Sequence, residues 1–171
     1  MMRHVMAVAA ALALASCAAS TPPPAAPASV EADHPEATPY DPSIDAGAAV
    51  DAALVRAAER DTRVLLVLGG NWCHDSRALA GWLETPRFAA LVADRYELVY
   101  VNVGLPQTGD GFNLDIARRF GIDDLPGTPN LFVIDPDGTL LNPDSVTTWR
   151  NAASRSEEAI YAELEALAPQ K

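Results

Sequence analysis

Apolar positions in this chain follow two different spacings. Val64 to Leu68 form a continuous apolar run rich in branched residues, which is typical of a strand covered on both faces. Leu98 to Val103 and Leu131 to Ile134 predict two further buried strands. Residues 45–60 instead carry apolar side chains at helical spacing, so they predict a helix with one buried stripe.

Helix signals occupy the interval between the first two predicted strands. One helix is predicted to begin at Cys73, directly after the first strand and its glycines. Thr85-Pro86 has the residue types of an N-cap and a first helical position, and therefore predicts a second helix. A short helix is predicted over residues 113–120, after a glycine-rich loop at 104–111.

The last part of the chain predicts a hairpin and a closing helix. Asp135-Pro136-Asp137-Gly138 is a turn-forming tetrapeptide that follows the third strand. Ser154 and Glu157 have the spacing of a capping box for the last helix. The order of elements predicts an α/β fold with a central mixed β-sheet flanked by helices.

The N-terminal segment has the pattern of an export signal. Arg3 and His4 precede an apolar run from Val5 to Ala15, which is too short to span a membrane as a stable helix. Its end, Leu14-Ala15-Ser16-Cys17, resembles a bacterial lipobox. The resemblance implies that residues 1–16 are removed and that lipid is attached to Cys17. An ordinary signal peptide with an incidental cysteine is the alternative.

Composition separates a tether from the domain that follows it. Ala, Pro, Ser and Thr dominate residues 17–45, so we expect a disordered, semi-extended tether there. Residues 46–168 are long enough for one domain with a single core. Loss of Arg3 with the signal leaves 11 basic against 23 acidic residues, a formal charge of −12. This acidity argues against nucleic acid as a partner.

Candidate chemistry lies in the segment Trp72-Cys73-His74-Asp75-Ser76. Cys73 stands where a strand enters a helix, and the unpaired N–H groups and dipole of the first helical turn favour a thiolate there. The chain has two cysteines, so lipid on Cys17 would leave no partner for an internal disulfide. With three histidines, one of them in the signal, and a single remaining cysteine, we expect neither a structural metal site nor a cofactor.

Over residues 46–168 the chain resembles the thioredoxin superfamily. The resemblance rests on the first strand, on Trp72-Cys73, and on Gly127-Thr128-Pro129-Asn130 before the third strand. It implies that Pro129 is cis and lies against Cys73. Two positions differ from the usual pattern of the family: Ser76 replaces the second, resolving cysteine, and Val67 replaces a buried acid.

The resemblance implies thiol-disulfide exchange that uses one cysteine. Formation of a mixed disulfide needs only Cys73, and Ser76 is expected to offer its hydroxyl to the sulfur, although a serine that merely replaces a lost cysteine is an open alternative. Trp72, His74, Thr128 and Pro129 are the candidate substrate-binding residues.

The competing hypothesis is a non-catalytic thioredoxin-fold module that captures a protein. In that case the surface around Cys73, or the loop at 104–111, would bind the partner.

The export signal also sets the expected location and partners. We expect a lipoprotein in the cell envelope that faces the periplasm, with the membrane contacted through lipid on Cys17. Ala18, rather than Asp, follows Cys17 and favours the outer over the inner membrane. The expected partners are periplasmic protein thiols and disulfides, or small thiols.

Overall fold

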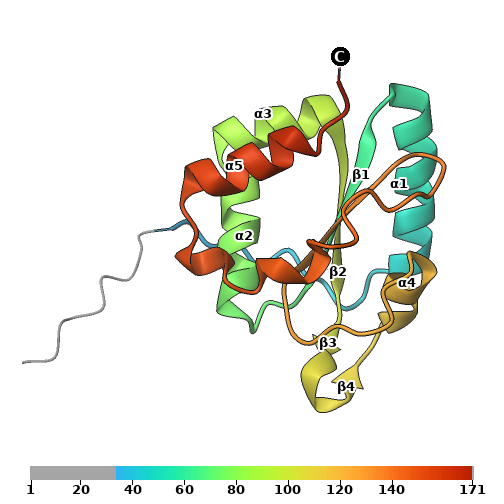
Figure 1. The fold of residues 1–171 in the computed structure, drawn as a ribbon. Coiled ribbons are helices and arrows are strands. Elements are labelled where there is room, and N and C mark those ends of the chain that lie inside the picture. Colours follow the sequence, from blue (N-terminus) through green and yellow to red (C-terminus); the bar gives the residue numbers. More distant parts are fainter. Residues whose placement is uncertain (1–33, 171) are drawn as a thin grey trace, which may run out of the picture. The chain divides into compact units, whose positions relative to one another are not determined.

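The computed structural model describes residues 34–170 (Figure 1). The predicted signal, the lipidation site at Cys17 and most of the predicted tether lie outside the described residues. No helix of the described part is both long and apolar enough to cross a membrane. The elements are α1 (Ala46–Arg60), β1 (Arg63–Gly69), α2 (His74–Glu84), α3 (Pro86–Arg95), β2 (Tyr96–Asn102), β3 (Gly104–Leu105), β4 (Asp110–Gly111), α4 (Leu114–Arg119), β5 (Asn130–Ile134) and α5 (Glu157–Ala166), with 3₁₀ turns at 106–108, 146–149 and 152–154.

A mixed three-stranded sheet lies at the centre of the domain, in the order β2-β1-β5. The central strand, β1, pairs in parallel with β2, from Arg63 opposite Tyr96 to Gly69 opposite Asn102. It pairs antiparallel with β5, where Leu66 lies opposite Phe132. The predicted α/β class and central mixed sheet are therefore confirmed.

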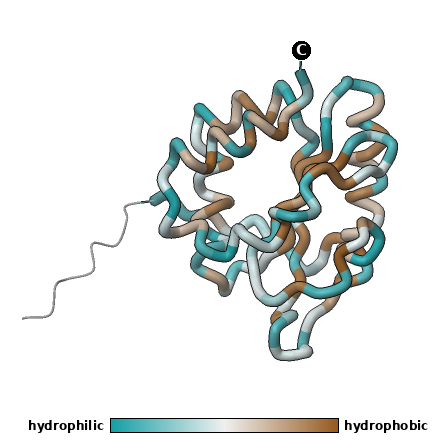
Figure 2. The backbone as a smooth tube through the Cα atoms, viewed as in Figure 1, coloured by the Kyte–Doolittle hydropathy of each residue, from teal (hydrophilic) through white to brown (hydrophobic). Residues whose placement is uncertain are grey.

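Both faces of β1 are covered, which explains its continuous apolar run. Val64, Leu66 and Leu68 belong to the core cluster that includes the buried face of α1. Leu65 and Val67 belong to a second cluster with residues of α2, α3 and α5. Figure 1 shows α1 on one side of the sheet and those three helices on the other, and Figure 2 shows hydrophobic positions concentrated in the strands between them. Side chains alternate between the faces of a strand, so one strand supplies both cores.

Polar contacts fix α1 over the sheet. Asp45 caps the helix, its side chain accepting a hydrogen bond from the backbone N–H of Ala48 at 3.0 Å. Glu97 of β2 is almost fully buried and forms ion pairs with Arg56 and Arg60 of α1. A buried carboxylate is tolerated only when it is paired in this way.

Two local predictions differ from the structure, and the predicted N-cap position at Thr85 is confirmed, without a side-chain cap. The segment after the 135–138 turn forms a single bridge, between Ile134 and Leu140, rather than a full strand. The last helix is capped by Ser156 and not by Ser154, because the helix begins at Glu157. Thr85 does occupy the N-cap of α3, but its hydroxyl donates to the carbonyl of Trp82 in the preceding helix and does not cap α3.

Residues 34–45 extend the packed region beyond the predicted limit at residue 46. Tyr40 is fully buried in the core, although the composition of this segment predicts a disordered tether. The Asn71 side chain accepts from the N–H of Tyr40 at 3.1 Å and donates to its carbonyl at 3.2 Å. Gly69 permits this approach, since a Cβ there would lie 2.7 Å from the tyrosine ring. A single aromatic side chain therefore anchors a segment that is otherwise poor in large apolar residues.

Candidate functional site

Cys73 lies at the N-cap of α2, immediately after the turn that leaves β1. Its backbone N–H donates to the carbonyl of Gly70 at 3.0 Å, which fixes the turn. Its side chain is half-buried, and the thiol donates to the carbonyl of Thr128 at 3.4 Å. The sulfur is thus held at the start of a helix, where backbone N–H groups favour negative charge.

The Thr128-Pro129 step directly precedes β5, whose first residue, Asn130, pairs with Leu68 near the end of β1. Both residues are buried, and the peptide bond between them is cis, as the resemblance implies. Asn130 begins β5, and its side-chain amide donates to the carbonyl of Gly127 at 2.7 Å, which holds the turn before the proline. The structure therefore brings Cys73, Thr128 and Pro129 together as expected.

Ser76 does not form the hydrogen bond that the sequence analysis predicts. Its side chain is fully buried, and its hydroxyl has no hydrogen-bond partner among the described residues. Ser76 begins the inward-facing stripe of α2 that continues at Leu79, Ala80 and Leu83. The residue faces the core, where the hydroxyl of Tyr40 donates to its backbone carbonyl at 3.3 Å. Burial raises the pKa of Tyr40 well above its usual value, so that hydroxyl remains a donor.

The structure gives Val67 a packing role and Asp75 a hydrogen-bonding role. Val67, which replaces the buried acid of the usual pattern, is fully buried in the core. Asp75 accepts a hydrogen bond from the backbone N–H of Ala153 at 2.9 Å, so its carboxylate fixes the turn before α5.

An exposed apolar patch includes Trp72, the residue before Cys73, and side chains next to Gly104. We define it as Trp72, Leu105 and Phe112, whose exposed fractions are 48%, 37% and 43%. The indole N–H of Trp72 donates to the carbonyl of Gly104 at 3.0 Å, and the ring of Phe112 also lies against Gly104. The β3–β4 hairpin thus carries two side chains of the patch. Sequence analysis singled out this loop and Trp72, but not Leu105 or Phe112.

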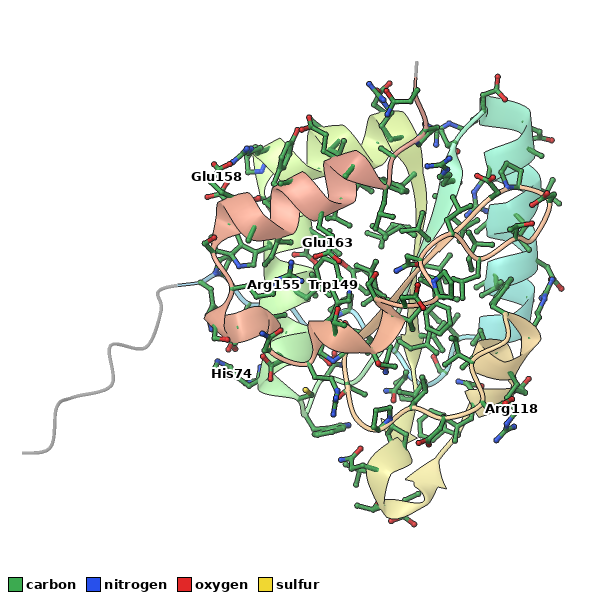
Figure 3. The ribbon with its side chains drawn as sticks, viewed as in Figure 1. His74, Arg118, Trp149, Arg155, Glu158 and Glu163 are labelled. Atoms are coloured by element: carbon green, nitrogen blue, oxygen red, sulfur yellow. The ribbon has the colours of Figure 1, made fainter. Side chains whose placement is uncertain are left out.

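His74 faces away from this patch. Its Nε2 lies 3.2 Å from Oε1 of Glu36, and its ring centroid lies 4.9 Å from that of His34. Figure 3 shows His74 at the first turn of α2. A hydrogen bond from Arg77, together with the positive charges of that arginine and the two histidines, lowers the pKa of Glu36. The structure therefore does not place His74 with the other candidate substrate-binding residues.

The fold and the thiol site together define the class of this protein. The family model described as thioredoxin-like matches residues 45–136, and the chain belongs to this family. A comparison with curated proteins found no match.

A solved structure agrees with this assignment. The chain is similar to a disulfide isomerase from Xylella fastidiosa Temecula1, with 32% sequence identity and a TM-score of 0.68. The similarity covers 77% of this chain and 97% of the isomerase chain.

Proposed function

We propose that this protein isomerises disulfide bonds in client proteins, with Cys73 as its single nucleophile. The observation that carries the proposal is the position of Cys73 at the N-cap of α2, directly after Trp72 of the exposed apolar patch and with its thiol 3.4 Å from the Thr128 carbonyl. Similarity to a disulfide isomerase supports the same reaction. Isomerisation leaves the number of disulfides unchanged, so it needs no second cysteine and no external reductant.

The reaction runs in three balanced steps. The Cys73 thiolate attacks one sulfur of a client disulfide; a bond forms between the two sulfurs, and the other client sulfur leaves as a thiolate. The released client thiolate attacks a second client disulfide and frees a different client thiolate, which then attacks the client sulfur of the mixed disulfide. A new client disulfide forms, and Cys73 is released as a thiolate. No electrons are gained or lost overall.

The surroundings of Cys73 suit an extended, partly unfolded client. The apolar patch binds side chains that a misfolded protein exposes. Once Cys73 is in a mixed disulfide, its thiol no longer donates to the Thr128 carbonyl. This carbonyl then accepts a hydrogen bond from the client backbone, which is a short form of strand addition.

The buried Ser76 supports a long-lived mixed disulfide. In a two-cysteine site, the second thiol attacks the mixed disulfide and ends it. Ser76 has no thiol, and its hydroxyl faces the core. Release of the enzyme therefore depends on thiols of the client or on a small thiol.

The direct test is recovery of a client protein that carries scrambled disulfides. We expect the wild-type chain to restore native disulfides in the presence of a catalytic amount of thiol, and Cys73→Ser to lose this activity. Binding of the client without any effect of Cys73→Ser would instead indicate the non-catalytic binding module. Activity only with excess small thiol, with net loss of client disulfides, would indicate a reductase.

We further propose that the protein is tethered to the cell envelope and faces the periplasm, anchored to the outer rather than the inner membrane. The sequence Leu14-Ala15-Ser16-Cys17 supports lipid attachment at Cys17. The mass and location of the membrane-fraction protein test this: Cys17→Ser should lose both the lipid mass and membrane attachment. An unchanged mass and location would contradict it.

A further inference from the structure

A cluster of metal-binding side chain types lies on the side of α2 away from the apolar patch. It consists of His34, Glu36 and His74, and we call it the His-Glu cluster. Their ligand atoms all lie within 4.8 Å of one another. Nothing in the exchange reaction uses this cluster. The count of histidines and cysteines predicts no metal site, because it leaves carboxylates out and because His34 lies in the predicted tether.

We propose that the His-Glu cluster binds one divalent transition-metal ion of borderline softness, such as Zn²⁺. Two imidazoles and one carboxylate form a known type of zinc ligand set with one position open. Ligand atoms of a tetrahedral zinc site lie about 3.4 Å apart, given bonds of about 2.0–2.2 Å. The 3.2 Å separation of His74 Nε2 and Glu36 Oε1 is already close to this value. The ligand atom of His34 lies within 4.8 Å of these two, so the set is completed by a small movement of this half-buried side chain.

The two oxygens of Glu36 have different partners, which favours a metal on one of them. Oε1 faces His74, whereas Oε2 accepts a hydrogen bond from Nε of Arg77 at 2.9 Å. His74 and Arg77 are three residues apart on α2, so they present one face to the carboxylate. The arginine thus orients Glu36 from its second oxygen, in the way that outer partners orient metal-binding carboxylates.

One ring nitrogen of His34 also has a partner, which leaves the other nitrogen for a metal. Its Nδ1 lies 3.4 Å from the carbonyl of Pro35, and donation to this carbonyl leaves Nε2 as the ligand atom. A hydrogen bond on one ring nitrogen is the usual way in which a protein selects the other for a metal.

The segment that carries two of the ligands is docked closely on α2. The backbone N–H of Ala37 donates to the carbonyl of Arg77 at 3.1 Å. Gly81 allows the contact: a Cβ at this position would lie 2.2 Å from the carbonyl oxygen of Pro35. An ion held by the His-Glu cluster would therefore join this segment to the helix that begins at Cys73. The site does not rest on the exchange reaction, because Cys73 supplies none of its ligands.

Competition for Zn²⁺ against a chromophoric chelator tests the proposal. The full chain is used without a polyhistidine tag and with Cys17→Ser, so that Cys73 is its sole thiol. We expect one Zn²⁺ per chain, with the dissociation constant raised about tenfold or more in each of His34→Ala, Glu36→Gln and His74→Ala. The double variant His34→Ala/His74→Ala gives the background from His4.

Cys73→Ser is the matched control for zinc binding by the thiol, and it should retain the affinity of the parent chain. Added Zn²⁺ should also raise the unfolding temperature of the parent chain but not that of His34→Ala. Equal affinity in the parent and the double variant would overturn the proposal. So would loss of the ion in Cys73→Ser with retention in His34→Ala. Neither result would bear on disulfide isomerisation, which the client assay measures separately.

Discussion

The thiol site and the His-Glu cluster flank the same turn of α2, but their side chains are held by different means. Backbone groups and the core position Cys73: it caps a helix, donates to the Thr128 carbonyl and precedes the buried Ser76. Charged side chains at the surface position the cluster, through the contacts of Glu36 with His74 and Arg77. The position of the thiol is therefore set by the packed core and backbone of the fold, whereas the cluster depends on the docking of the segment before α1.

The largest effect is expected at the thiol site, from a substitution that should leave the His-Glu cluster unaffected. Cys73→Ser should abolish recovery of a scrambled client, because no other thiol is present among the described residues to form the mixed disulfide. The same variant should bind Zn²⁺ with the affinity of the parent chain. Recovery of the scrambled client measures the loss of isomerisation. Chelator competition on the same preparation measures the affinity for Zn²⁺. Residual isomerisation in Cys73→Ser would contradict the assignment of the nucleophile.

Ser76→Cys should change the thiol site from one cysteine to two. The Cα atoms of residues three apart on a helix lie about 5 Å apart, which is within the Cα–Cα range that a disulfide bridges. The introduced thiol should attack the mixed disulfide, form an internal disulfide with Cys73 and release the client reduced. Free-thiol counting by mass spectrometry, on the Cys17→Ser background, follows this change. Two free thiols after incubation with a disulfide would contradict the geometry.

Gly81→Ala should affect the His-Glu cluster more than the thiol site. The added methyl group meets the backbone of Pro35, so the segment must shift, at a cost of about 1–3 kcal/mol in the free energy of unfolding. We expect weaker Zn²⁺ binding by this variant although no ligand is changed. Ala80→Gly, one residue earlier on the same helix, controls for general destabilisation of α2. Unchanged zinc affinity in Gly81→Ala would show that zinc binding by the His-Glu cluster does not depend on the docking of the segment before α1.

Trp72→Ala should have the smallest effect, and only on the client. The indole is half-exposed and belongs to the apolar patch, so its loss should raise the KM for a protein client about fivefold and leave kcat nearly unchanged. Initial rates at several client concentrations distinguish the two parameters. Val55→Ala, at an exposed apolar side chain on α1, is the matched control. An equal KM change in both variants would argue against the patch as a client surface.

The difference between the regions also explains what the sequence could predict. The β1 strand, the helix that begins after Cys73, and the approach of Thr128-Pro129 follow from local patterns and from the resemblance. The burial of Ser76 could have been predicted from the sequence, because Ser76, Leu79, Ala80 and Leu83 have the spacing of one helical face.

The His-Glu cluster was not predictable in this way. His34 and Glu36 lie in a segment whose composition is typical of disorder. Its docking depends on the burial of Tyr40 and on hydrogen bonds between Tyr40 and Asn71, which lies far along the chain. Such a contact has no local sequence pattern; only an isolated aromatic residue in a polar stretch hints at it.

Direct detection of the mixed disulfide tests the central claim most sharply. The full chain with Cys17→Ser is incubated with a client carrying scrambled disulfides, quenched with acid and analysed by intact mass spectrometry. The account predicts a client adduct on Cys73 that accumulates in the parent chain, is depleted in Ser76→Cys, and yields native client disulfides as it decays. Absence of any adduct in the parent chain, while client disulfides are still rearranged, would contradict it.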